Sequence, residues 1–314
     1  METAFTRLVG CRHPVQLATM GGVSTPALAG AVAGAGGLGM LSGIAAEPVA
    51  PSIAAALDAA HGGALGMGFL GPWLDHVLPD FEVAASRLRV VEVFWRDPDP
   101  SLVERARSSG EALVAWQVGS VDEARAAVDA GCDFVVAQGV EAGGHVRATT
   151  PRAELLDGVL AAVSVPVVTA GGIVAASDVA AALAAGAAAV RVGTRFLATP
   201  EADLHPAYLQ ALLDATSAAD TELTTTFGSG WPDAPHRVLA SCIAAARGLN
   251  GEPAGEVEFA GQSMPVEQYA VSPPTAATRG RIDAMALYAG SGVGLVTHVQ
   301  PAADVVADLV SRLS

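Results

Sequence analysis

The chain of 314 residues is 51% hydrophobic and 16% charged, and its formal net charge is −15. This composition can bury a sizeable core, so we expect neither disorder nor more than one or two domains. Nucleic acid is not an expected partner, because binding its phosphates requires a basic face. All 17 basic residues are arginines, which excludes Schiff-base lysine chemistry and a Walker-type phosphate loop.

The cysteine pattern and one uncharged segment indicate which cellular compartment to expect. Cys11, Cys132 and Cys242 lie far apart and form no CxxC pair, so we expect neither a disulfide framework nor a metal site. A reducing cytoplasm fits this pattern. Residues 14–46 carry no charge, but a proline and many glycines interrupt them, so no membrane span is expected. The amino terminus also lacks the pattern of a secretory signal.

Short apolar runs that favour β-structure recur through the first 192 residues. In chain order, the predicted strands are Val15–Ala18, Leu38–Leu41, Ala64–Met67, Val90–Phe94, Leu113–Gln117, Phe134–Ala137, Val167–Ala170 and Ala189–Val192. The alanine-rich stretches between them have helix-like apolar spacing and predict helices such as Thr25–Ala35, Val49–Ala60, Val121–Ala130 and Ser177–Ala185. Strand alternating with helix predicts an α/β fold, the (β/α)8 TIM barrel. A doubly wound open sheet is the alternative.

This alternation stops after the eighth predicted strand. Residues 196–285 include the segments Gly228–Pro232 and Ser272–Pro274, which are rich in glycine and proline. We expect a barrel made of residues 1–195 and 286–314, and an inserted domain of residues 196–285 over the barrel mouth. The apolar spacing of Ala302–Leu313 predicts a final helix that returns to the barrel.

The segment Gln138–His145 gives the clearest indication of chemistry. It directly follows a predicted strand and ends in Gly143, Gly144 and His145. Function in such barrels lies at the carboxyl ends of the strands, and glycines let the backbone approach a ligand closely. An imidazole there can act as a base or as a hydrogen-bond donor near neutral pH. We therefore expect His145 to be a catalytic residue.

Two glycine segments follow the last two predicted strands. They are Gly171-Gly172 and Gly193-Thr194. Open backbone amides with one hydroxyl donor can surround a phosphate, and the last two strands form the common phosphate site of TIM barrels. Either glycine segment alone is as well explained by a turn. The two together predict phosphate binding.

Other candidates have simpler explanations. His236, next to Arg237, is a second candidate, whereas the remaining histidines have no comparable setting. We expect Glu141 to accept hydrogen bonds from backbone amides, which would make it a structural residue. Tryptophans could line a ligand pocket, but buried tryptophan is more often core. The candidates of this kind are Trp95, Trp116 and Trp231.

Nearly the whole chain resembles the FMN-dependent nitronate monooxygenases. The glycine segments alone are shared with other FMN barrels, and the Ala-Gly-Gly-His motif at residues 142–145 narrows the resemblance to this family. The matching segments, in the family's order, are Met20–Pro26, Ala35–Gly39, Ala137–His145, Ala170–Ile173, Gly193–Phe196 and Tyr288–Gly292.

The resemblance implies a barrel that holds FMN and an inserted, mainly helical domain that closes the site. It implies that His145 faces the substrate and the flavin. Tyr288 and Ser291 are candidate substrate contacts. Arg147 is a further candidate that would supply local positive potential for an anion, and a solvated surface arginine explains it equally well. By motif match it assigns the flavin contacts to Met20, Gly21, Gly22, Gln138, Gly143, Gly172, Gly193 and Thr194. We add Gly68, Gln117, Gly171 and Arg191 as candidate flavin contacts.

The chain departs from the family pattern at several of these positions. Thr19 stands where a proline is common, Gly68 where an asparagine is common, and Arg191 where a glutamine is common. Val146 and Arg147 follow the histidine, where a glycine usually comes two residues after it. These positions bear on flavin affinity and on substrate identity.

Three functions remain open on the sequence alone. The first is oxidative denitrification of an alkyl nitronate or nitroalkane with O2, giving a carbonyl compound and nitrite. His145 would then either hydrogen-bond the nitronate oxygens or remove the α-proton of a neutral nitroalkane. The second is an NAD(P)H-dependent FMN reductase acting on quinones or enoyl thioesters. The third is a flavin-binding scaffold without activity. The sequence does not predict an oligomeric state.

Overall fold

Eight parallel strands form a barrel in this computed structural model, which describes residues 1–44, 48–259 and 262–313. The strand order is β1-β9-β8-β6-β5-β4-β3-β2, and a parallel bridge between Gln16 and Leu38 joins β1 to β2. The closed ring confirms the predicted barrel, and the open-sheet alternative is wrong. The strands are β1 (Val15–Leu17), β2 (Gly39–Ser42), β3 (Leu65–Leu70), β4 (Val90–Phe94), β5 (Leu113–Val118), β6 (Phe134–Gln138), β8 (Val167–Ala170) and β9 (Ala189–Val192).

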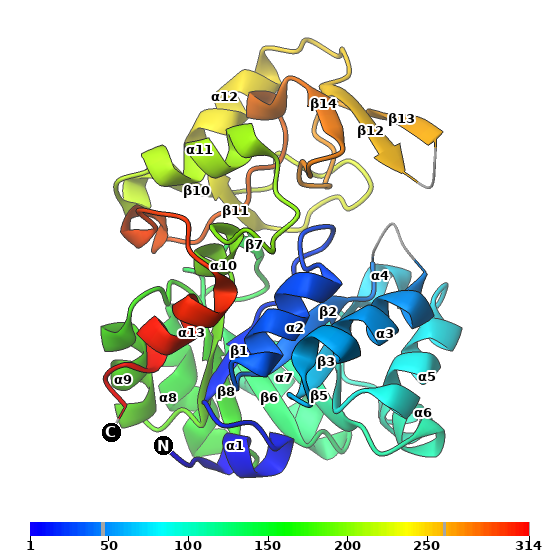
Figure 1. Cartoon of the computed structure of the whole chain (residues 1–314), viewed down its shortest axis with the longest axis vertical. Helices are drawn as coiled ribbons and strands as arrows, with labels where there is room; N and C mark the ends of the chain where they lie inside the picture. The colour runs from blue at the N-terminus through cyan, green and yellow to red at the C-terminus, as the bar shows by residue number, and fades with distance from the viewer. Residues whose placement is uncertain (45–47, 260–261, 314) are drawn as a thin grey trace.

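Helices connect these strands and pack around the barrel (Figure 1). Side-chain caps set some of their starts: Thr25 accepts from the Leu28 amide at 2.9 Å, and Ser120 accepts from the Glu123 amide at 3.1 Å. The last helix, α13 (Ala302–Val310), packs against the second and ninth helices. The connecting helices are α2 (Pro26–Gly34), α3 (Val49–Ala60), α4 (Gly71–Leu74), α5 (Leu78–Arg87), α6 (Pro100–Ser109), α7 (Val121–Asp129), α8 (Arg152–Ala162) and α9 (Ala176–Ala184).

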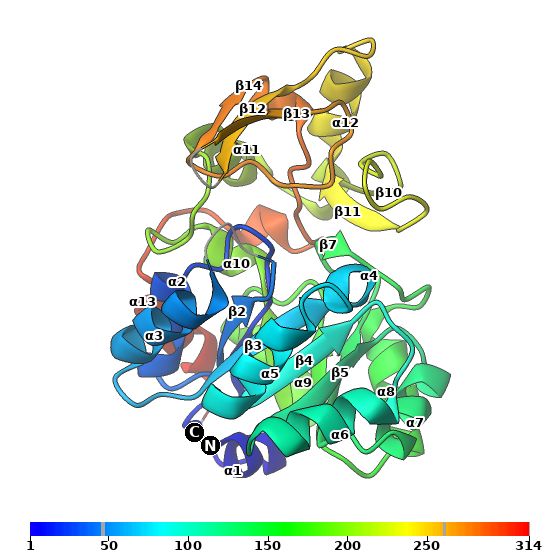
Figure 2. The same ribbon diagram turned by 90° about the vertical axis from the view of Figure 1, so that its right-hand side faces the viewer.

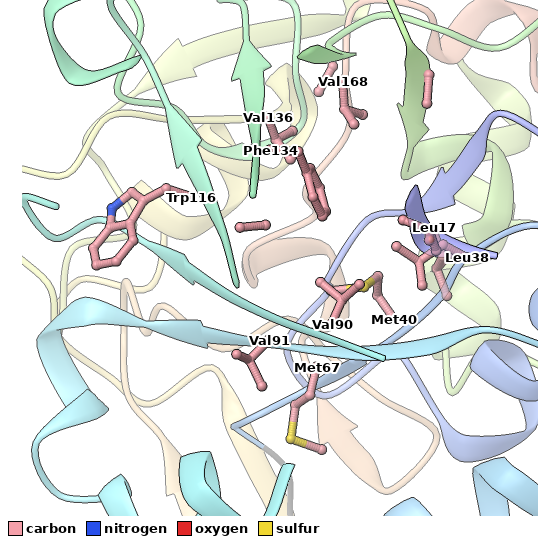
Figure 3. Close-up of a cluster of buried hydrophobic side chains, with 14 of the residues drawn as sticks. Leu17, Leu38, Met40, Met67, Val90, Val91, Trp116, Phe134, Val136 and Val168 are labelled. Atoms are coloured by element: carbon pink, nitrogen blue, oxygen red, sulfur yellow. The ribbon is translucent and has the colours of Figure 1, made fainter. Parts of the chain in front are cut away.

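The barrel interior is a packed apolar core. Leu17, Met40, Val90 and Phe134 are each fully buried inside it (Figure 3). The first helix, α1 (Ala4–Val9), adds Phe5, whose ring meets Phe134 edge-on at 5.4 Å. Filling the barrel with side chains leaves its mouth as the place where a ligand can bind.

Residues between β9 and α13 build a second lobe above the barrel (Figures 1 and 2). This lobe has its own apolar core, which runs from Leu197 to Val293 along the chain and also takes in Val23. The described part of this lobe combines short helices with two small antiparallel sheets, so the segment 196–285 is mixed and the expectation of a mainly helical insertion is corrected. Its elements are α10 (Thr194–Leu197), α11 (Pro206–Asp214), η1 (Ala218–Asp220), β10 (Thr221–Thr224), β11 (His236–Leu239), α12 (Ala240–Arg247), β12 (Gly255–Phe259), β13 (Gln262–Val266), β14 (Thr278–Gly280) and η2 (Ile282–Ala284), followed by η3 (Val293–Leu295).

The loop after β6 joins the two lobes. Its two-residue strand β7 (Gly144–His145) pairs antiparallel with β11, so that His145 lies opposite His236. The predicted catalytic loop is therefore attached to the barrel through β6 and to the upper lobe through β11. Within the described ranges, no helix is long and apolar enough to cross a membrane.

Candidate active site

A pocket lies at the carboxyl ends of the barrel strands, between the barrel and the upper lobe. Met20 and Gly21 line it from the end of β1, Gln117 from β5, Gln138 from β6 and Arg191 from β9. The structure thus brings together residues that the sequence placed at separate strand ends. The upper lobe adds walls of its own, formed by Leu197, Tyr208, Trp231, Val271 and Pro273.

The two predicted glycine segments meet on one side of this pocket. Gly171 and Gly172 have φ values of 117° and 68°, in the left-handed region that favours glycine. A Cβ on Gly172 would lie 3.0 Å from the Ser291 Oγ, so the backbone there is closely packed. Gly193 and Thr194 line the pocket beside them, and the Thr194 Oγ1 accepts a hydrogen bond from the Gly290 amide at 3.0 Å.

The loop after β6 is fixed by backbone contacts. The Glu141 carboxylate accepts from the Arg152 amide at 2.9 and 3.0 Å, which confirms its predicted structural role. Its carbonyl oxygen accepts from the Ser291 amide at 2.9 Å. A Cβ on Gly143 would lie 2.6 Å from the Gly290 nitrogen. Glycine at 143 is therefore required by close approach of two backbones, in addition to its place in the pocket lining.

His145 lies at the centre of an aromatic cluster. Its ring stacks on Trp231 with centroids 3.9 Å apart and planes 16° apart. Trp95 meets it edge-on at 5.9 Å, and His236 and Tyr288 lie at 5.1 and 5.6 Å. The Nε2 atom is buried and has no hydrogen-bond partner among the described residues. A buried polar atom that lines a pocket and lacks a protein partner is a candidate ligand contact.

Burial keeps both histidines of this cluster neutral. Burial, followed by the nearby His236, lowers the pKa of His145 to about 3. Burial also lowers the pKa of His236. The ring of His236 is fixed because its Nε2 accepts from the Phe227 amide at 3.1 Å, which leaves its Nδ1 to donate to the Ala234 carbonyl at 2.8 Å. His236 is thus a structural partner of the loop that carries His145, with both ring nitrogens occupied.

The sequence did not predict which tryptophans lie near His145. Trp116 is core, as expected, but Trp231 and Trp95 contact His145, and Trp73 meets Trp231 edge-on at 5.0 Å. Trp95 has a φ of 62°, an unusual conformation for a bulky residue and one found often at functional sites. The glycines that precede Trp231 and the proline that follows it were the available signal, but they indicated only a loop.

Tyr288 lies in the pocket wall, and its hydroxyl is already engaged. That hydroxyl donates to the Val271 carbonyl at 2.6 Å, and burial raises its pKa well above the usual range. The hydroxyl of Tyr208 in turn donates to the carbonyl of Tyr288. These bonds make Tyr288 a wall residue that positions the pocket.

A buried ion pair lies in the barrel beneath the pocket. The Arg191 guanidinium bonds to the Glu92 carboxylate and to the Gln117 side-chain oxygen. The Gln16 amide nitrogen donates to the same carboxylate at 3.3 Å. Sequence analysis singled out Arg191 and Gln117 but missed Glu92. This residue lies in an otherwise apolar strand, and nothing in that strand's sequence indicated a buried ion-pair partner.

Four predicted residues lie outside the pocket lining. Gly22 faces Thr275, and Ser291 lies behind Gly172. Gly68 faces Thr19, whose hydroxyl occupies the space that a side chain at 68 would need. Thr19 lines the pocket, and its Oγ1 is buried with no partner in the part of the chain that the structure describes.

Arg147 is the fourth, and its expected role in substrate binding is corrected. Its guanidinium pairs with Glu123 at 3.0 Å and with Asp97 at 3.2 Å. It lies 5.8 Å from the ring centroid of Trp95, and it lines a separate shallow surface depression. With its charge already paired, Arg147 supports Trp95 and does not face the pocket.

Comparison with known proteins gives a consistent answer. The family model described as nitronate monooxygenase matches residues 2–62 and 76–312. A nitronate monooxygenase from Pseudomonas aeruginosa is 34% identical, and the match covers 100% of this chain and 99% of the relative. A hydroxy-methyl-oxo-octahydroindene carboxyl-CoA dehydrogenase from Mycobacterium tuberculosis is also 34% identical, over 76% of this chain and 66% of the relative.

A solved structure supports the same conclusion. The nitroalkane oxidase of Streptomyces ansochromogenes superposes with a TM-score of 0.80 at 30% identity, covering 99% of this chain and 98% of its own. Fold, family match and full-length relatives agree, so the inactive-scaffold hypothesis is set aside. The chain is an oxidoreductase that belongs to the nitronate monooxygenase family.

Proposed function

We propose that this enzyme converts alkyl nitronates and O2 to carbonyl compounds and nitrite, with FMN bound in the pocket at the barrel mouth. The observation that carries the proposal is the environment of His145. Its imidazole is neutral and half-buried, its buried Nε2 has no hydrogen-bond partner within the described chain, and the residue lines the same pocket as the paired glycine segments. Family membership supports the reaction class.

The residues of the pocket fit FMN. Gly171, Gly172, Gly193 and Thr194 form an open backbone cradle suited to a phosphate at the mouths of β8 and β9. Gln138 offers a second contact, because its Oε1 is buried without a protein partner in the described ranges while its Nε2 donates to the His145 carbonyl at 3.2 Å. When bound, FMN supplies the electron acceptor and the reaction with oxygen.

The protein groups orient the substrate and shape its charge environment. A neutral imidazole can donate one hydrogen bond to a nitronate oxygen, and hydrogen bonds to a charged acceptor are the stronger class. Because burial lowers the pKa of His145 to about 3, the imidazole is a weak base. The structure therefore favours the preformed nitronate over the neutral nitroalkane as substrate. It also favours hydrogen bonding by His145 over proton removal.

The aromatic wall sets the character of the substrate side. Trp73, Trp231 and Tyr288 line the pocket next to His145 and present apolar rings. Such walls suit the alkyl part of a nitronate and exclude water from the reacting atoms. We propose that residues 196–285, which supply Trp231, act as the inserted domain over the pocket, with the barrel formed by 1–195 and 286–314. A cytoplasmic location is part of the proposal, supported by the three free cysteines.

Turnover in air tests the proposed reaction. Purified enzyme loaded with FMN and given a short-chain alkyl nitronate should consume O2 and release nitrite and the matching carbonyl compound. Enzyme stripped of FMN is the control, and it should release neither above the rate without protein. Oxygen uptake without nitrite would contradict the proposal.

The second candidate is reduction or oxidation of a thioester with a nicotinamide partner. One observation favours it: the dehydrogenase relative from Mycobacterium tuberculosis is named for a carboxyl-CoA substrate. That relative matches 76% of this chain, whereas the nitronate monooxygenase relative matches all of it. Rapid reduction of the bound flavin by NADPH, but not by a nitronate, would support this second function.

A further inference from the structure

Four buried polar side chains converge under the pocket from four different strands. Glu92 on β4 is 1% exposed, Arg191 on β9 and Gln117 on β5 are each 5% exposed, and Gln16 on β1 is fully buried. Arg191 bonds to both Glu92 and Gln117, and Gln16 donates to Glu92. The cluster replaces apolar core at the level where the barrel meets the pocket.

The two charges of this ion pair lie at different distances from the pocket. Arg191 and Gln117 line the pocket, whereas Glu92 and Gln16 do not belong to its lining. The positive end of the pair therefore faces the pocket, and the negative end lies behind it in the barrel. The Nε of Arg191 has no hydrogen-bond partner in the described chain, so one donor of the guanidinium is not engaged by its protein neighbours.

Stability gives no reason to keep such a pair. Two charges lose their hydration on burial, and apolar side chains of similar volume often stabilise a core equally well. A fixed charge under a ligand pocket, by contrast, acts strongly in a medium of low dielectric constant. The ligand that the proposed function places there is a redox-active ring, which becomes more negative when it is reduced.

We propose that the Glu92–Arg191 pair sets the reduction potential of the bound flavin, with Arg191 favouring the reduced ring and Glu92 opposing it. The inference rests on the proposed binding of FMN. Two-electron reduction adds two electrons from the donor and one proton from solvent, which leaves one negative charge on the ring. The positive end of the pair stabilises that charge, and the carboxylate behind it limits the effect.

Reduction potentials of four variants test this assignment. The FMN-loaded enzyme and its E92Q, R191Q and E92Q/R191Q variants are titrated anaerobically with dithionite against a reference dye. R191Q should shift the reduction equilibrium toward the oxidised flavin by about tenfold, which is ~30 mV for a two-electron couple. E92Q should shift it in the opposite direction. The double variant, which has neither charge, should lie between the two.

The opposite signs separate an electrostatic role from structural damage. Two single variants that shift the potential in the same direction, or not at all, overturn the inference. R191K keeps the charge and should stay close to the wild-type potential, so it provides the test if R191Q is unstable. Wild-type protein that binds no FMN would refute the proposed function itself. Normal FMN binding with unchanged potentials would refute only the role of the ion pair.

Discussion

Replacing His145 by alanine should reduce turnover of a nitronate while leaving FMN in place. His145 is half-buried and lines the pocket, and its Nε2 has no hydrogen-bond partner in the described chain. A hydrogen bond to a charged group contributes about 1.5–3 kcal/mol. At 1.36 kcal/mol per tenfold, its loss predicts a fall in kcat/KM of about 10- to 150-fold. The glycine cradle lies on other strands, so flavin occupancy should be unchanged.

The same variant distinguishes hydrogen bonding from base catalysis. At 1.36 kcal/mol per pKa unit, protonating an imidazole with a pKa of about 3 costs about 5 kcal/mol more than protonating one at 6.5. His145 is thus a poor acceptor for the α-proton of a nitroalkane. Wild-type enzyme should turn over neutral nitroalkane much more slowly than nitronate, and the variant should not lose more with the neutral form.

The assay is steady-state oxygen uptake with both substrate forms, prepared separately and compared at one pH. Flavin content is measured from the visible spectrum of the same samples. The reasoning fails if the variant keeps full activity on the nitronate. It also fails if wild type uses neutral nitroalkane as well as nitronate and the variant loses activity only on the neutral form, because His145 would then be a base.

Three further predictions concern the cradle, the wall and the protonation state. Gly172→Ala should weaken FMN binding at least tenfold in a fluorescence titration. Gly62→Ala is the matched control: Gly62 has a φ of 86° and open space where a Cβ would lie, so the variant carries the same ~1–2 kcal/mol of backbone strain. This control should leave FMN binding unchanged. Trp231→Phe should change the preference between short and long nitronates, measured as a ratio of kcat/KM, whereas Trp116→Phe in the core should not. The folded protein binds a proton at His145 only near pH 3, but the unfolded chain binds it near 6.5. Its contribution to the free energy of unfolding is therefore lost as pH falls through that window, and denaturant titrations should show a shallower fall for H145Q. An equally steep fall would contradict the low pKa.

The barrel could be predicted because each strand is specified locally. Runs such as Phe134–Ala137 and Val167–Ala170 are almost entirely apolar, as buried parallel strands are. Glycines or alanine-rich helical segments separate one run from the next. Strand-end residues that line the pocket then followed from topology, because the carboxyl ends of all strands meet at one mouth. They include Met20, Gln117, Gln138, Gly171 and Gly193.

What the sequence could not predict depends on contacts between distant segments. The pairing of β7 with β11 brings His236 beside His145, although 91 positions separate them in the chain. The stack of Trp231 on His145 arises from that same pairing. Arg147 was predicted in the pocket because it lies two residues from His145 in the sequence. In the structure its guanidinium instead pairs with Glu123 and Asp97, away from the pocket. The two small sheets of the upper lobe were missed because their strands are short and largely polar.

Anaerobic mixing of the purified, FMN-loaded enzyme with a nitronate tests the central claim most directly. The visible absorbance of the oxidised flavin should bleach within the turnover time when an alkyl nitronate is added, and it should return when air is admitted and nitrite appears. NADPH added instead should leave the spectrum unchanged on that timescale. Bleaching by NADPH alone, with no response to the nitronate, would contradict the account and assign the enzyme to the nicotinamide-dependent reductases.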